Sequence, residues 1–183
     1  MLYFFLGAVA LAACAAWTDF RTGHIPNQIT FPALGLAIVA HAIHGASVQG
    51  LGGALSEGGF AFGGALACGL APLFMHLRGG MGGGDVKLFA AIGALLHPLA
   101  GLEAETYAFV AAAVLAMTKL AWQGTLLRTL GNTTTLVMNP LRRKEAKREV
   151  PQEMRAWFRL GPAIFIGTAA TFAVHYFSLR AAP

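Results

Sequence analysis

The stretch Gly79-Gly80-Met81-Gly82-Gly83-Gly84-Asp85-Val86-Lys87 joins two apolar segments and places an acid where the second one begins. Five of its first six residues are glycine, which reaches positive φ and allows close backbone approach. Asp85 heads the apolar run 86–101, so we expect it to cap exposed N–H groups at the positive end of a helix. A carboxylate at the edge of a membrane is costly, so Asp85 is predicted to be functional.

The composition indicates a membrane protein. The chain has 183 residues, of which 56% are hydrophobic and 11% charged, whereas soluble domains carry about 25% charged residues. Nothing is left over for a separate soluble domain, so we expect one integral-membrane domain over residues 1–183. The two cysteines, Cys14 and Cys68, form no CxxC pair, which excludes a zinc knuckle or a redox pair built from them.

Six apolar segments approach the roughly 20 residues that a helix needs to cross hydrocarbon. They cover residues 2–18, 29–44, 59–77, 86–101, 105–123 and 160–179. The predicted fold is therefore all-α, a polytopic membrane protein with six transmembrane helices. The fourth segment is the weakest, because it is short and carries His97-Pro98. Small residues such as Gly64 and Gly93 are expected to let neighbouring helices approach closely.

The positive charges indicate an orientation. With six spans, every Lys and Arg except Arg180 falls on one side of the membrane, and eight of the thirteen lie between Arg128 and Arg159. The positive-inside rule makes that side cytoplasmic and places both termini outside. Contact with anionic lipid explains the basic loop 124–159 better than nucleic-acid binding does. Residues 142–148 are predicted to form a short amphipathic helix at the membrane surface.

The first segment is expected to remain as a helix rather than to be removed. Leu11-Ala12-Ala13-Cys14 resembles a lipoprotein cleavage box. However, no Lys or Arg precedes the apolar run, whereas a signal peptide begins with a charged region. Cleavage there would also discard the approach to a second acid, Asp19.

Asp19 is placed like Asp85, at the end of an apolar segment. After it, Pro26 pushes Ile25 toward extended backbone, and Asn27 is expected to cap the next segment. A helix C-terminus repels a negative charge, so a merely solvated acid explains Asp19 poorly. In the six-span topology both aspartates face the cytoplasm. We interpret the chain as a scaffold that brings them together.

Two carboxylates held close share a proton, because both cannot ionise cheaply. One then acts as a base on water, and the other as an acid toward a carbonyl oxygen or a leaving amine. This pair is sufficient for peptide hydrolysis, and no cofactor is expected. No metal is expected either, because neither His24 nor His97 has a second ligand at helical spacing. Which aspartate carries the proton stays open.

These residues resemble the motifs of the type IV prepilin leader peptidases, which are GxGD intramembrane aspartic proteases. Gly82-Gly83-Gly84-Asp85 followed by Val86-Lys87-Leu88 is similar to the GxGD motif. Asp19 with Ile25-Pro26-Asn27 is similar to the first aspartate motif. The resemblance implies that Asp19 and Asp85 are the catalytic pair of a multi-pass enzyme in the bacterial inner membrane.

The same resemblance implies the substrate, a type IV prepilin or pseudopilin. It would be cut on the cytoplasmic side, between a short basic leader and a hydrophobic helix. Gly82, Gly83 and Gly84 either bind the substrate backbone or only allow Asp85 to approach Asp19, and both interpretations stay open.

The chain is similar to the short, Tad-type members, which process small Flp pilins. Longer members carry an N-terminal extension with paired CxxC motifs and also methylate the new N-terminus. This sequence begins at the first catalytic span, so N-methyltransferase activity is not expected. Members often carry Pro and Gly where the last span starts. Leu160-Gly161-Pro162 fits that pattern only in part, and it is assigned no function.

Two other functions are compatible with paired membrane acids. A proton- or cation-coupled transporter would use Asp19 and Asp85 as carriers. Carriers usually place such charges near the bilayer midplane, whereas both acids here lie at the cytoplasmic ends of their segments. An inactive pilus-assembly scaffold is the other alternative, against which the intact acid pair argues. A flux assay separates the first alternative from the protease, and a leader-cleavage assay separates the second.

Overall fold

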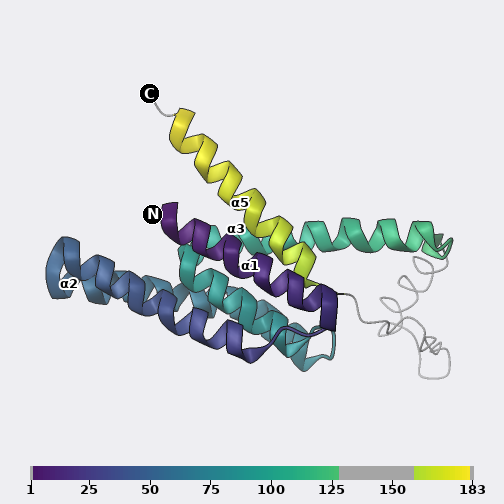
Figure 1. Ribbon diagram of the computed structural model, residues 1–183, viewed down its shortest axis with the longest axis horizontal. Coiled ribbons are helices and arrows are strands. Elements are labelled where there is room, and N and C mark those ends of the chain that lie inside the picture. The colour runs from purple at the N-terminus through teal and green to yellow at the C-terminus, as the bar shows by residue number, and fades with distance from the viewer. Residues whose placement is uncertain (1, 128–158, 182–183) are drawn as a thin grey trace, which may run out of the picture. The chain divides into compact units, whose positions relative to one another are not determined.

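The computed structural model describes residues 2–127 and 159–181 (Figure 1). In this part of the chain the secondary structure is helical, without strands. The helices are α1 (Leu2–Thr22), α2 (Asn27–Leu77), α3 (Gly83–Trp122) and α5 (Gly161–Ala181). The predicted all-α class is confirmed for these residues. The predicted amphipathic helix at 142–148 lies outside them.

The chain divides into two compact units. The first contains Met1–Ala112 together with Arg159–Pro183, and the second contains Ala113–Phe158. The described residues of the second unit comprise the last turns of α3 and the chain that follows, up to residue 127. Both aspartates lie in the first unit. The single functional domain expected from the sequence stays a prediction.

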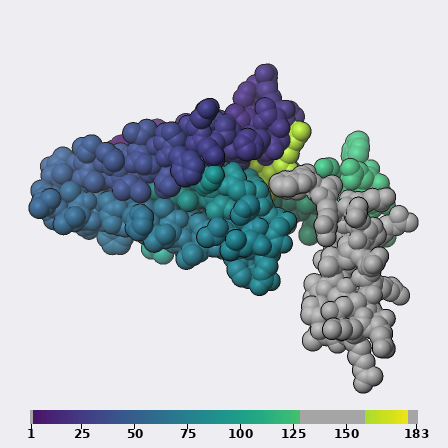
Figure 2. Space-filling model, turned by 90° about the horizontal axis from the view of Figure 1, so that it is seen from below, coloured from purple at the N-terminus to yellow at the C-terminus, as the bar shows by residue number. Residues whose placement is uncertain are grey.

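Helix α2 doubles back on itself. Gln49 and Gly50 leave the helical conformation, and Gly50 has a φ of 64° that suits glycine. A Cβ on Gly58 would lie 3.3 Å from the Cβ of Ala42, although about 24 Å of straight helix would separate these positions. Residues 27–48 and 51–77 are therefore two antiparallel arms, seen side by side in Figures 1 and 2.

Helix α3 reverses in the same way at His97, which has a φ of 65° and a ψ of 170°. The rings of Phe89 and Phe109 stack with centroids 5.5 Å apart, where a straight helix would separate them by about 30 Å. The predicted segment 86–101 is wrong at its end, because it runs through this reversal. A residue before proline is disfavoured in the helical region, and His97 leaves that region here, so the second arm starts at Pro98.

Three of the described helices, α1, α2 and α3, are long and apolar enough to cross a membrane. Together with the composition, they make this a helical membrane protein. The two reversals divide α2 and α3 into two arms each. These arms, with α1 and α5, correspond to the six apolar segments of the sequence. That each of them crosses the bilayer stays a prediction.

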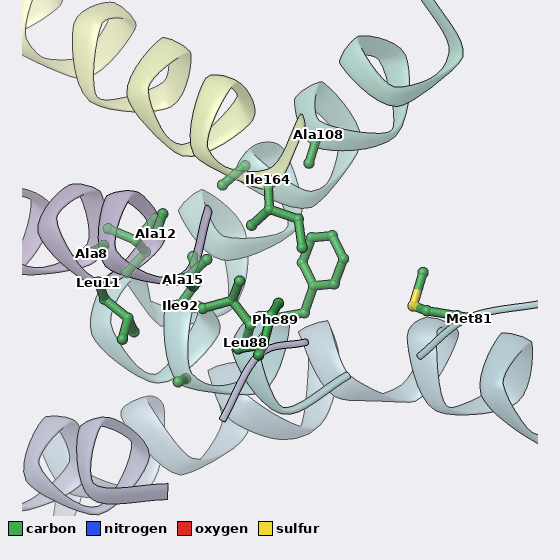
Figure 3. Close-up of a cluster of buried hydrophobic side chains, with 14 residues drawn as sticks. Ala8, Leu11, Ala12, Ala15, Met81, Leu88, Phe89, Ile92, Ala108 and Ile164 are labelled. Atoms are coloured by element: carbon green, nitrogen blue, oxygen red, sulfur yellow. The ribbon is translucent and has the colours of Figure 1, made fainter. Parts of the chain in front are cut away.

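The core packs one face of α1 against the first arm of α3 and the start of α5. Figure 3 shows Ala12 and Ala15 of α1 close to Ile92 of α3, with Ile164 of α5 nearby. The buried positions of α1 recur every three or four residues: Phe4, Ala8, Leu11, Ala12, Ala15 and Asp19. Asp19 is thus the last position of the apolar stripe, and the packing of α1 directs it inward.

The second arm of α2 crosses the first arm of α3 with their backbones in contact. A Cβ on Gly64 would collide with the carbonyl oxygen of Gly93, and a Cβ on Gly93 would collide with that of Gly64. The prediction that these glycines allow close helix approach is confirmed. Such a crossing gives dense packing where lipid supplies no hydrophobic drive between helices.

Candidate active site

Asp19 lies one turn inside the end of α1, not after it as the apolar segment suggested. The helix continues to Thr22, and the N–H of Gly23 donates to the Asp19 carbonyl oxygen at 2.8 Å. Gly23 has a φ of 69°, the left-handed conformation that commonly ends a helix. The side chain of Asp19 is only 6% exposed, so its carboxylate must find polar partners within the protein.

One such partner is the start of α5. The backbone N–H of Gly161 donates to Asp19 Oδ2 at 2.9 Å. Beside it, Arg159 Nη1 donates to the carbonyl oxygen of Phe20 at 2.7 Å. The first N–H groups of a helix have no partners within the helix and carry partial positive charge, which suits a carboxylate. Gly161, which the sequence left without a role, therefore anchors Asp19.

Asp85 lies in the first turn of α3, which begins at Gly83. It is the third residue of that helix, the position from which the acid of a capping box faces the residue before the helix, here Gly82. The predicted place of Asp85 at the start of a helix is confirmed, and its capping role stays a prediction.

The glycine loop is held from both sides. His76 Nδ1 donates to the carbonyl oxygen of Met81 at 2.9 Å, and the side chain of Met81 is buried. A Cβ on Gly84 would lie 3.0 Å from the Cβ of Ile25, so this glycine packs tightly on the turn after α1. Sequence reasoning missed His76, because an isolated histidine at the end of an apolar segment carries no motif.

Lys87 links the two aspartate motifs. Its Nζ donates to Asn27 Oδ1 at 2.7 Å and lies 4.8 Å from the ring centroid of Phe31. The predicted capping role of Asn27 is wrong, since no side chain caps the start of α2. Asn27 is itself the first residue of that helix, and its side-chain amide oxygen accepts the hydrogen bond from Lys87 instead.

Asp19 and Asp85 lie close enough for their carboxylates to interact electrostatically. The end of α1 and the start of α3 supply them, and the core packing of these two helices brings them together. His24 is exposed in the turn after α1, and His97 lies at the far end of the first arm of α3. A carboxylate pair in a part-buried site has the acid and the base needed for hydrolysis.

The fold and the site define a class: helical membrane proteins that bring two aspartates together at neighbouring helix ends. The family model for the type IV leader peptidase family matches residues 5–117. Because the match covers more than half of the chain, and both aspartates with it, this chain belongs to the type IV leader peptidase family. Searches of curated proteins and of solved structures gave no match. The resemblance read from the two motifs is confirmed at the level of the family.

Proposed function

We propose that this chain is an intramembrane aspartic endopeptidase that removes the basic leader from type IV prepilins or pseudopilins of the Flp type. Family membership supports leader-peptidase activity in general. The observation that supports the aspartic mechanism most directly is that Asp19 at the end of α1 and Asp85 at the start of α3 interact electrostatically. Asp19 is also oriented by the Gly161 N–H, as a positioned acid or base requires.

The proposed reaction needs only the two side chains and one water. One carboxylate takes a proton from the water as the water oxygen bonds to the scissile carbonyl carbon. The other carboxyl group gives its proton to the carbonyl oxygen, which yields a neutral diol. The C–N bond then breaks as the amine nitrogen receives a proton from one carboxyl group and a diol hydroxyl returns one to the other. The pair ends with a single shared proton, as it began.

The length of the first arm of α3 supports cleavage at the membrane edge. Residues 83–96 span about 20 Å at 1.5 Å per residue, whereas the hydrocarbon core is about 30 Å thick. Asp85 and His97 therefore cannot both reach the membrane surfaces along this arm. A carboxylate pair at or just below the surface suits a substrate cut where a basic leader meets an apolar helix.

In the proposed topology, α1, both arms of α2, both arms of α3, and α5 cross the bacterial inner membrane, and at least one end of the short first arm of α3 lies below the membrane surface. The site faces the cytoplasm and both termini face outward, as the positive charges predict. We expect the basic loop 124–159, most of which lies outside the described residues, to meet anionic headgroups rather than nucleic acid. The tight packing of Gly84 against Ile25 supports the structural interpretation of the glycine motif, in which it lets Asp85 approach Asp19.

Co-expression with a Flp-type prepilin, followed by mass spectrometry of the product, tests this function. We expect a pilin shortened by its leader, with an unmethylated N-terminus. Prepilin expressed without the enzyme is the control and should stay uncut. Uncut prepilin beside folded, membrane-inserted enzyme would refute the proposed substrate. A methyl group on the new N-terminus would refute the expectation of peptidase activity alone.

A further inference from the structure

Three potential metal ligands meet at the end of the first unit where α2 and α3 reverse. His41 comes from the first arm of α2, Glu57 from its second arm, and His97 from the reversal of α3. His97 Nε2 lies 3.0 Å from His41 Nδ1. Glu57 Oε2 lies 3.7 Å from His41 Nδ1 and 3.6 Å from His97 Nε2. The three ligand atoms thus form one triangle.

The three side chains of this triangle do not supply enough hydrogen-bond donors for all of its acceptor atoms. His41 is buried, and its Nε2 lies 3.0 Å from the Leu95 carbonyl oxygen, so Nε2 carries the proton and Nδ1 a lone pair. His97 Nε2 donates at most one proton into the triangle. Glu57 Oε2 is a buried atom without a hydrogen-bond partner among the described residues. An unpaired buried carboxylate oxygen is costly, whereas a cation between the three atoms would satisfy all of them.

The dimensions fit a tetrahedral zinc-type ion. Zinc bonds to imidazole nitrogen and carboxylate oxygen at about 2.0–2.1 Å, which gives a ligand–ligand edge of about 3.4 Å in a tetrahedron. The observed edges of 3.0, 3.6 and 3.7 Å bracket that value. Two histidines and one glutamate form a known zinc ligand set that leaves the fourth position for water.

The surroundings hold the ligands in place. The hydrogen bond from His41 to Leu95 fixes its tautomer, as the outer partners of metal-bound histidines do. The ring of Phe4 stacks on His41 with centroids 3.5 Å apart. His97 occupies a backbone region, at a φ of 65° and a ψ of 170°, that is nearly confined to glycine. Such a conformation persists in a histidine only where its surroundings compensate for the strain.

We propose that His41 Nδ1, Glu57 Oε2 and His97 Nε2 bind one divalent transition-metal ion of the zinc type. The ion ties both arms of α2 to the reversal of α3. This site is separate from the aspartate pair, which lies at the other end of the first arm of α3. The sequence showed no metal site, because the ligands come from three helical arms and none has a partner at helical spacing.

The test uses the full chain in detergent, stripped with a chelator and titrated with Zn²⁺, and with Co²⁺ as a spectroscopic probe. We expect one Zn²⁺ per chain, a tetrahedral Co²⁺ absorption band, and a Tm raised by at least about 4 °C at saturating zinc. Absence of zinc binding in the wild-type chain would overturn the proposal. Binding of Mg²⁺ or Ca²⁺ in preference to zinc would also overturn it, because those ions favour all-oxygen ligands.

Two variants and one control assign the ligands. Glu57→Gln keeps the side-chain shape but removes the charge, and His97→Gly removes a ligand while relieving the backbone strain. Both should weaken zinc binding at least about tenfold and reduce the rise in Tm measured at the same zinc concentration. His44→Gln is the matched control, because His44 bonds to the Tyr3 hydroxyl and lies outside the triangle. Retention of the full zinc response in both variants would contradict the assignment. Prepilin cleavage is not a readout, so failure here leaves the proposed function untouched.

Discussion

The backbone N–H of Gly161 donates a hydrogen bond to Asp19 Oδ2 at 2.9 Å, across 142 positions of sequence. It joins the last turn of α1 to the first residue of α5 in a buried setting. A side-chain donor would add rotamers of its own, whereas a backbone donor at a helix start is fixed by the helix. The position of α5 therefore sets the direction of the Asp19 carboxylate.

Gly161→Ala should lower leader cleavage by about 10- to 100-fold. A Cβ at this position would lie 2.8 Å from the Asp19 Cβ and 2.9 Å from Oδ2, so the carboxylate or α5 must move. Small displacements of a catalytic group carry losses of that size. The measurement is the initial rate of prepilin cleavage by equal amounts of purified enzyme.

Gly35→Ala is the matched control for that variant. A Cβ on Gly35, in the first arm of α2, would meet nothing within 4 Å. Alanine is the better helix former by about 0.5–1 kcal/mol, so cleavage should stay within about twofold of wild type. Equal rates for both variants would show that the Gly161 contact does not position Asp19.

Within the glycine motif, alanine should be tolerated at Gly83 and harmful at Gly84. A Cβ on Gly84 would lie 3.0 Å from the Ile25 Cβ and 3.1 Å from its carbonyl oxygen, and neither is the end of a flexible side chain. On Gly83 the nearest atom would be His76 Cε1 at 3.5 Å, an ordinary contact. We expect at least about a tenfold loss of cleavage for Gly84→Ala, since Asp85 moves with the helix start. A larger loss for Gly83→Ala would instead favour contact of this loop with substrate.

The backbone crossing between α2 and α3 should control stability. Gly64→Ala places a methyl group against the Gly93 carbonyl, whereas Gly63→Ala meets only Pro98 Cγ at 3.9 Å. Overpacking of this kind costs about 1–3 kcal/mol, which corresponds to a Tm lower by about 5 °C in a chain of this size. Thermal unfolding of both variants in the same detergent checks this, and equal Tm values would refute the close crossing.

Much of this arrangement could be predicted from local sequence. Apolar length predicted the helices, and the position of Asp85 after the glycine run predicted its place in the first turn of α3. Small residues predicted the close crossing at Gly64 and Gly93. These features depend on neighbours within a few residues, so the sequence contains them directly.

The features that escaped prediction depend on distant contacts. His97-Pro98 weakened the fourth segment as a span, but it marks the reversal of α3. Asn27 is a residue type that often caps helices, yet its side-chain oxygen accepts a hydrogen bond from Lys87, sixty positions away. The contact of Gly161 with Asp19 depends on how α5 packs against α1, and no periodicity within either segment encodes that packing.

The central claim is that Asp19 and Asp85 act as one pair, and the most direct measurement is prepilin cleavage by Asp19→Asn and Asp85→Asn. Asparagine keeps the shape, and its amide oxygen can still accept the Gly161 N–H, so both variants should remain folded in the membrane. Each should cleave at least about 10²-fold more slowly than wild type, because each lacks an acid or base that the reaction requires. Wild-type cleavage by Asp19→Asn, with Asp85→Asn inactive, would contradict the pair.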